Sequence, residues 1–308
     1  MAITVHTLPK TIARWRAKYR RRWLPFWFLL PVGLVVSAVI GYPVVRALIL
    51  SLFSYNPLSG ATAYVGLQNY TTVLADPVFR GAALRTVIWT FGVVIAQFLF
   101  GLLGAVLLNQ SFPGRGLVRG LVLIPWATPS VLAAMMWLWL LDSNYGVIND
   151  LLGRVGLGAL AYAWFSLPAT ALPALMLIDF WQGVPFFAVM LLAALQTIPS
   201  DIIEAAVLDG GNRWQIFWRI TFPLLLPTVL ITTLLRVIWT ASYIDLILII
   251  TQGGPGVATL TVPAYAYYAA YSDFAFGKAT AAAVLQAVVL LVIVIVYLRL
   301  LSRKGALE

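Results

Sequence analysis

Six long runs of apolar residues constrain this chain more than any other feature of its sequence. A helix needs about 20 mostly apolar residues to cross the hydrocarbon core of a bilayer. The runs cover residues 24–51, 86–108, 117–141, 169–195, 224–250 and 279–298. None of them shows the strict alternation of a barrel strand, and a chain in lipid has to satisfy its backbone hydrogen bonds internally. We therefore predict an all-α polytopic membrane protein with six transmembrane helices.

The composition excludes a soluble enzyme. Charged residues make up only 10% of the 308 residues and hydrophobic residues 62%, whereas an ordinary soluble domain is about 25% charged. The chain has no cysteine, which excludes thiolate chemistry. Its single histidine, His6, is too few for the active site of a zinc or serine membrane protease. The net charge of +10 lies at the ends of the apolar runs instead of in a patch, so nucleic acid is not an expected partner.

The basic residues set the orientation, because cytoplasmic loops carry an excess of Lys and Arg. They concentrate in the tail 1–23, in the loops after the second and fourth runs, and in the tail 302–308, and all of these lie on one side. We predict that both termini are cytoplasmic. The expected organisation is a basic N-tail (1–23), a six-helix permease domain (24–301) and a C-tail (302–308).

The connection between the fourth and fifth runs, residues 196–223, is long for a helix connector, and loops of this size usually have a function. Residues 201–209 place apolar side chains on one helical face, and Gly210 can end that helix. Asn212 with Gln215 three residues later is a capping-box pattern for a second helix, which is expected to end near Pro223. The loop therefore predicts a cytoplasmic helix-turn-helix. The alternative is an interfacial amphipathic hairpin that only joins two spans.

The sequence of this loop resembles a family signature. The chain reads Glu204-Ala205-Ala206, then Gly210, then Ile220-Thr-Phe-Pro223. This resembles the signature of the permease subunits of bacterial ATP-binding-cassette importers, which reads Glu-Ala-Ala, three residues, Gly, nine residues and Ile-x-Leu-Pro. Other stretches resemble the carbohydrate branch, and the larger permease of maltose-type transporters in particular; they lie at residues 66–70, 76–79, 145–149 and 251–255.

The resemblance implies a division of labour among several chains. A cytoplasmic ATPase dimer would dock on the loop, with Glu204 as the ionic docking residue and Gly210 permitting the bend. The residues implied in ATPase coupling are Glu204, Ala205, Ala206, Asp209, Gly210, Ile220 and Pro223. The other implied partners are a second, non-identical permease and an extracytoplasmic solute-binding protein, assembled in the bacterial cytoplasmic (inner) membrane.

ATP hydrolysis is expected on another chain. The one Gly-Lys pair before a small residue is Gly277-Lys278-Ala279, and position 272 is Ser where a Walker A loop needs Gly. We therefore expect no catalytic residues, no metal site and no cofactor in this chain, with ATP and Mg²⁺ bound by the partner ATPase.

Charged residues inside spans are costly and usually functional. Asp179 and Arg236 enter the fourth and fifth runs from opposite sides, so at about 1.5 Å per residue both are expected near mid-bilayer, where alternating-access transporters place their sites. Polar and aromatic residues recur at helical spacing around both of them. By resemblance, the substrate pathway comprises Asp179, Trp181, Gln182, Gly183, Phe186, Arg236, Trp239, Thr240 and Tyr243.

Aromatic rings beside a few hydrogen-bonding groups suit a sugar, because its C–H faces stack and its hydroxyls need donors and acceptors. Several alternatives stay open at this point. Asp179 and Arg236 could form a purely structural ion pair, or Arg236 could attract an anionic solute such as a glycerol phosphate. The chain could be an ion-coupled secondary transporter, or an intramembrane aspartyl protease built on Asp179 and Asp245. Gln97 and Gln286 are expected to make interhelical hydrogen bonds.

Overall fold

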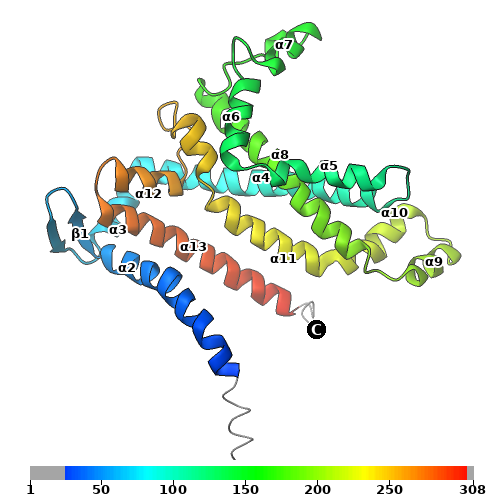
Figure 1. The fold of residues 1–308 in the computed structure, drawn as a ribbon, viewed down its shortest axis with the longest axis horizontal. Helices are drawn as coiled ribbons and strands as arrows, with labels where there is room; N and C mark the ends of the chain where they lie inside the picture. The colour runs from blue at the N-terminus through cyan, green and yellow to red at the C-terminus, as the bar shows by residue number, and fades with distance from the viewer. Residues whose placement is uncertain (1–24, 304–308) are drawn as a thin grey trace, which may run out of the picture.

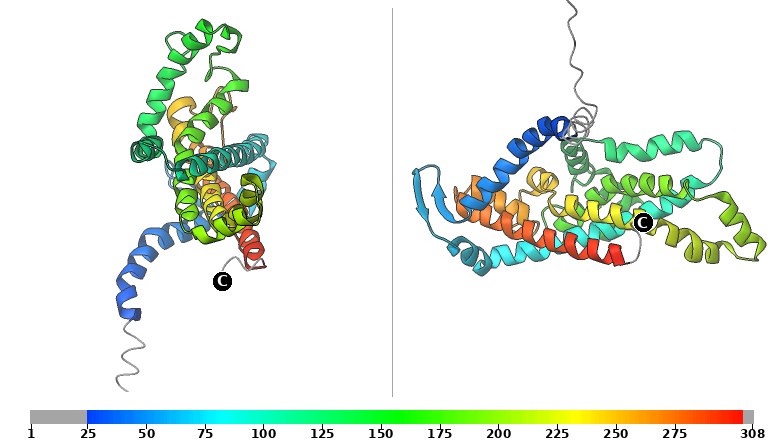
Figure 2. Two further views of the ribbon diagram at one scale, coloured as in Figure 1. Left: turned by 90° about the vertical axis from the view of Figure 1, so that its right-hand side faces the viewer. Right: turned by 90° about the horizontal axis from the view of Figure 1, so that it is seen from below.

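The computed structural model describes residues 25–303. The predicted N-tail 1–23 and residues 304–308 of the predicted C-tail lie outside the described residues. The described part begins with an apolar helix, Pro25–Leu50, which contains the π-helical turn η1 (Ser37–Gly41) and ends as α2 (Tyr42–Leu50). None of the residues of η1 and α2 is buried in the chain. This helix leaves the bundle on the side opposite to α6 and α7 (Figures 1 and 2).

A small β-hairpin follows, which the all-α prediction missed. Strands β1 (Phe53–Asn56) and β2 (Ala61–Tyr64) pair antiparallel, with Phe53 opposite Tyr64. Its turn is held by Asn56, whose side-chain oxygen accepts from the Leu58 amide at 2.9 Å. Such Asn turns are a local signal that the apolar periodicity of the flanking runs does not reveal. The rest of the described fold is helical, so the fold class is confirmed apart from this hairpin.

The bundle is built from long helices that lie roughly side by side (Figure 1). At its centre α4 (Pro77–Asn109) and α8 (Pro168–Leu195) pack together, and they carry most of the fully buried large side chains. Helix α11 (Phe222–Ala241) packs on both, α13 (Phe276–Arg303) packs on α11, and α5 (Arg115–Ala127) packs on α8. Short elements lie at one end of the bundle: β1, β2, α3 (Gln68–Ala75) and α12 (Val262–Tyr271).

The third apolar run is not one straight helix. It forms α5 and α6 (Ser130–Leu140), which are bent by 94° at the break. Thr128 is extended because it precedes Pro129, and this dipeptide ends α5. After α6 the chain forms α7 (Val147–Arg154) and the 3-10 turn η2 (Gly158–Leu160). The prediction of one continuous helix over 117–141 is therefore wrong.

The fifth run is also interrupted, so the prediction of one helix over 224–250 is wrong. Helix α11 ends at Ala241, and the π-helical turn η4 (Ile247–Thr251) follows after a break. The last turn of α11 tightens to short-range bonds, with the Tyr243 amide donating to the Thr240 carbonyl at 3.2 Å. Beyond it, Asp245 accepts from the Ser130 hydroxyl at 2.8 Å, which ties the break to the start of α6.

Five helices of the described chain are long and apolar enough to cross a membrane, or six if the bent pair of α5 and α6 counts as one span. The predicted runs at the first, second, fourth and sixth positions each correspond to one long helix. Helix α4 begins nine residues before the predicted run of 86–108, because Asp76 caps it and Pro77 occupies its first turn. The cytoplasmic placement of both termini stays a prediction.

Asp76 ties three elements together at the hairpin end of the bundle. Its carboxylate accepts from the Tyr265 hydroxyl of α12 at 2.7 Å and from Lys278 Nζ of α13 at 3.0 Å, and it caps α4 through the Val78 amide at 2.8 Å. Partial burial raises the pKa of Asp76, but these three hydrogen bonds and the charge of Lys278 outweigh it. The pKa of Asp76 falls from 3.8 to about 2.

We expect the substitution Asp76→Asn to lower the free energy of unfolding at neutral pH by about 1 kcal/mol, the scale of a partly solvated, hydrogen-bonded ion pair. Because the pKa of Asp76 is lowered in the folded state, its stabilisation is complete above pH 3.8 and is lost as the pH falls towards about 2. Thermal unfolding of both proteins in detergent over this pH range measures the difference. A difference that stays constant as the pH falls through this range would contradict the assignment.

Candidate functional site

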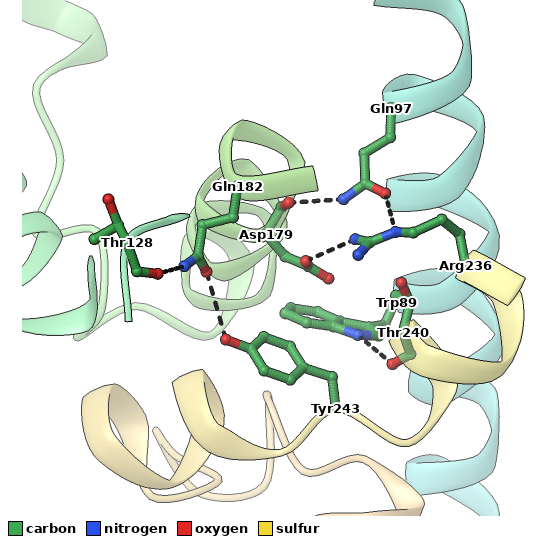
Figure 3. A network of polar contacts seen from close by, with 8 residues as sticks. All are labelled: Trp89, Gln97, Thr128, Asp179, Gln182, Arg236, Thr240 and Tyr243. Carbon is green, nitrogen blue, oxygen red and sulfur yellow. Dashed lines mark hydrogen bonds and ion pairs between the residues drawn. The ribbon is translucent and has the colours of Figure 1, made fainter. Parts of the chain in front are cut away.

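A buried polar network joins α4, α8 and α11 in the middle of the bundle (Figure 3). Arg236 Nη2 of α11 lies 3.3 Å from Asp179 Oδ1 of α8, and Arg236 Nε donates to Gln97 Oε1 of α4 at 2.9 Å. Gln97 Nε2 in turn donates to the Asp179 backbone carbonyl at 2.7 Å. The residue Gln97 is 0% exposed, Asp179 4% and Arg236 8%. The ion pair that the sequence left as an alternative is therefore present, and Gln97 completes it.

Gly183 leaves the space that this network occupies. It lies one helical turn after Asp179, and a Cβ atom at this position would overlap the Gln97 amide and the Arg236 guanidinium. Only a residue without a side chain lets both groups approach α8 this closely. The structure thus gives Gly183 a steric role beside the pathway and not a place on its surface.

A small cavity of about 140 Å³ opens next to the ion pair. It is lined by Trp126, Asp179, Gln182, Arg236, Trp239, Thr240 and Tyr243. Two of its polar atoms, Asp179 Oδ2 and Thr240 Oγ1, are buried and have no hydrogen-bond partner among the described residues. Buried polar atoms are normally paired, so two unpaired oxygens on residues that line one cavity are unusual. The cavity therefore combines aromatic walls with unpaired hydrogen-bonding groups.

The structure brings six of the nine predicted pathway residues to this cavity and places the other three around it. Phe186 supports the wall, because its ring packs edge-on against Trp239 with ring centroids 5.4 Å apart. Trp181 points to α6, where it packs against Trp137 at 5.7 Å, and Gly183 faces Gln97. Tyr243 lies beyond the end of α11 and still reaches Gln182 Oε1, at 3.4 Å.

Sequence reasoning missed Trp126 as a lining residue and treated Gln97 as structural. Trp126 lies in the last turn of α5, and the residues three and four positions before it, Leu123 and Val122, are apolar and mark no polar face. The only available signal for Gln97 was its amide in the middle of a long apolar run. The predicted hydrogen bonds of Gln97 and Gln286 are confirmed, the latter donating to the Ala241 carbonyl at 2.7 Å.

The two membrane aspartates do not share partners. Asp179 pairs with Arg236, and Asp245 accepts from Ser130. A protease dyad needs two carboxylates that face each other and share a proton. This arrangement gives no support to the aspartyl protease alternative.

The loop 196–223 forms the predicted first helix and turn at the far end of the bundle from the hairpin (Figure 1). Helix α9 (Ser200–Leu208) carries Glu204, Ala205 and Ala206, and Asp209 is its C-cap. Gly210 follows with φ of +82°, a left-handed conformation that glycine adopts without strain. The predicted capping box is confirmed. The Asn212 side chain accepts from the Gln215 backbone amide at 2.9 Å, and the Gln215 side chain accepts from the Asn212 backbone amide at 3.0 Å.

The second helix of the loop does not end near Pro223, so that part of the prediction is wrong. Helix α10 (Arg213–Ile216) continues through the π-helical turn η3 (Phe217–Thr221), which contains Ile220, into α11. The Phe222 amide bonds to the Phe217 carbonyl five residues back. A wider turn just before Pro223 accommodates a residue that has no amide hydrogen and whose ring would otherwise clash with the preceding turn. The second helix of the loop is therefore continuous with α11, the helix that carries Arg236.

The loop exposes apolar surface. Leu208 is 88% exposed and Trp214 71%, and they belong to α9 and α10, which lie at this end of the bundle (Figure 1). Behind α9 a groove of about 760 Å³ is lined by Glu204 and Val207 from α9, by Arg213 and Phe217 from the second helix, and by Asn109 at the end of α4. Exposed apolar residues beside a groove with opposite charges are typical of a protein-binding surface.

Residues 97–305 match the family described as the binding-protein-dependent transport system inner membrane component. The chain belongs to this family. It is a multi-pass inner-membrane transport subunit and not an enzyme. The matched residues include the network of Gln97, Asp179 and Arg236 as well as the loop 196–223.

Curated relatives of similar length resemble nearly the whole chain. The sulfoquinovosyl glycerol transport system permease protein SmoG of Agrobacterium fabrum is 35% identical, over 92% of both chains. The trehalose/maltose transport system permease protein MalF of Thermococcus litoralis is also 35% identical, over 92% of this chain and 95% of the relative. Among solved structures, a bacterial importer of the acidic polysaccharide alginate shares the fold, with a TM-score of 0.81, 23% identity and coverage of 94% and 99%.

Proposed function

We propose that the chain forms one half of a carbohydrate pathway through the membrane and switches it by alternating access. The observation that carries this is the cavity between α8 and α11, where Trp239 and Tyr243 stand beside the unpaired atoms Asp179 Oδ2 and Thr240 Oγ1. Aromatic faces stack on the C–H faces of a sugar, and the unpaired oxygens can accept from its hydroxyls. The similarity to permeases named for sulfoquinovosyl glycerol and trehalose/maltose supports the same class of solute.

The small volume and the exposed walls of the cavity favour a second permease that completes the site. Its volume of about 140 Å³ is below the roughly 300–1,000 Å³ of typical ligand pockets. Two of its aromatic walls are open, since Trp126 is 53% exposed and Trp239 48%. We therefore infer that a similar, non-identical chain covers this face and supplies the remaining contacts to the solute.

The loop 196–223 would dock a cytoplasmic ATPase dimer, with ATP and Mg²⁺ held by that partner. Glu204 lines the groove behind α9, Ala205 and Ala206 allow close approach, and Gly210 makes the turn into the second helix. Because α10, η3 and α11 are continuous, a rigid-body displacement of the loop reaches Arg236 through the helix that carries it. An extracytoplasmic solute-binding protein would deliver the solute at the opposite end, in keeping with the family.

An uptake screen tests this function. The complete complex is reconstituted in proteoliposomes with ATP inside, and uptake of radiolabelled neutral disaccharides, sulfonated sugars and glycerol phosphate is compared. We expect ATP-dependent uptake of a carbohydrate that falls at least tenfold in Trp239→Ala, which removes the stacking surface. Uptake that needs an ion gradient and no ATP would contradict the proposal and favour a secondary transporter.

An anionic solute is the second candidate, and Arg236 is the observation that favours it. One edge of its guanidinium is already shared between Gln97 and Asp179, so the pair presents no net charge to the cavity in this structure. A neutral, hydroxyl-rich solute fits that arrangement better. Uptake of glycerol phosphate alone in the screen would select the anionic alternative.

A further inference from the structure

We propose that Gln97 is a positioning residue: it holds the guanidinium of Arg236 against Asp179 and thereby sets the charge that the cavity presents to a solute. This inference rests on the proposed function of the cavity. Gln97 does not line the cavity itself, and it belongs to α4, whereas every other member of the network belongs to α8 or α11. Its effect on a solute would therefore act through Arg236.

The distances show why the ion pair alone leaves the guanidinium loosely held. Charge-assisted bonds between a guanidinium and a carboxylate are usually 2.7–2.9 Å, and the contact between Arg236 Nη2 and Asp179 Oδ1 is 3.3 Å and single. The bond from Arg236 Nε to Gln97 Oε1 is 2.9 Å. The shorter of the two contacts thus comes from a neutral amide on a third helix.

The amide of Gln97 is itself fixed in direction. Its Nε2 donates to the Asp179 carbonyl at 2.7 Å, so its oxygen has to face Arg236. Neither end of the side chain can turn without losing a bond inside a fully buried site, where an unpaired polar group is costly. Gly183 keeps the space for this arrangement open. These contacts leave the Gln97 amide one orientation. We call Gln97, bonded in this way to Arg236 and to the Asp179 carbonyl, the clamp.

The clamp decides which charge faces the cavity. With Gln97 in place, the positive charge of Arg236 is aimed at Asp179 and the two charges balance. Without its acceptor, the guanidinium is expected to turn towards the cavity, which it already lines, and to make the cavity attractive to anions.

Thiol labelling measures this charge without any solute. The chain has no cysteine, so Trp239→Cys gives one reporter in the wall of the cavity. In the complete complex, its rate of reaction is measured with two methanethiosulfonate reagents, one anionic (sulfonatoethyl) and one cationic (trimethylammonioethyl), by mass spectrometry of this chain. We expect Gln97→Met to raise the ratio of anionic to cationic rates about tenfold, as befits one freed charge nearby.

Gln97→Glu separates positioning from packing. Glutamate keeps an acceptor for Arg236 and adds a negative charge, so we expect the ratio to fall below that of the parent. Gly183→Ala, which displaces both partners, should raise the ratio as Gln97→Met does, and it serves if Gln97→Met does not fold. The matched control is Gln286→Met, another interhelical glutamine, which bonds to Ala241 outside the network and should leave the ratio unchanged.

An equal ratio of anionic to cationic labelling rates in the parent and in Gln97→Met would overturn the assignment. A shift of this ratio in the same direction in Gln97→Met and Gln97→Glu would overturn it as well. The labelling needs neither ATP nor solute, so its outcome is independent of the uptake screen. Failure of the screen with the expected labelling pattern would remove the carbohydrate proposal and leave the clamp in place.

Discussion

Replacing Arg236 with methionine is expected to lower the free energy of unfolding by about 3–5 kcal/mol, because it leaves the carboxylate of Asp179 buried without its cation. Asp179 is 4% exposed, its Oδ2 lacks a hydrogen-bond partner among the described residues, and Arg236 is the cation with which it pairs. Thermal or denaturant unfolding of the purified chain in detergent measures the loss.

The double variant Asp179→Asn with Arg236→Met provides the control. It removes both charges, and replacement of a whole buried ion pair is often neutral to stability. We therefore expect it to recover most of the stability that the single variant loses. Arg219→Met, which removes a basic residue of η3 outside the network, should change the stability little. A single Arg236→Met variant as stable as Arg219→Met would show that the network holds no buried charge.

The second large effect is expected in the loop between α8 and α11. Glu204→Gln should weaken binding of the partner ATPase about 30-fold, the equivalent of losing about 2 kcal/mol at an interface hot spot. The change keeps the size and helix propensity of the side chain and removes only its charge. Titration of the ATPase onto the membrane complex in nanodiscs measures the affinity directly.

Asp201→Asn is the matched control, since Asp201 is an exposed acid of the same helix, in its first turn. It is absent from the groove behind α9 that Glu204 lines, so we expect its affinity for the ATPase to stay within about threefold of the parent. Equal losses in both variants would point to the net charge of α9 and contradict a specific contact at Glu204.

Local rules were enough for several parts of the fold. Apolar runs located α4, α8 and α13, and the pattern of Asn212 and Gln215 located the capping box. Helical spacing predicted that the polar residues of each of the two helices α8 and α11 share one face, and residues of both faces line the same cavity in the structure.

Other parts depend on contacts between distant residues. The two partners of Gln97 lie 82 and 139 residues away in the chain, so periodicity cannot reveal that its amide connects them. The break after α11 is tied to α6 by the contact of Asp245 with Ser130, 115 residues apart. By contrast, Pro129 was a local signal for the bend between α5 and α6, which the length of the apolar run outweighed.

The second helix of the loop 196–223 differs from its prediction for a local reason. The sequence predicts that this helix ends near Pro223, because a proline usually stops a helix. The π-helical turn η3 absorbs this proline and lets α10 run into α11. On the proposed function, this continuity would let α11 carry a displacement of the loop to Arg236, past Pro227 inside the helix.

Mass spectrometry of the affinity-tagged chain, released from its native membrane in mild detergent, tests the central claim most directly. The account predicts recovery of an ATPase bearing a Walker A motif together with a second, non-identical permease, and loss of the ATPase but not of the permease in Glu204→Gln. A folded chain recovered repeatedly alone, or only with copies of itself, would contradict the account.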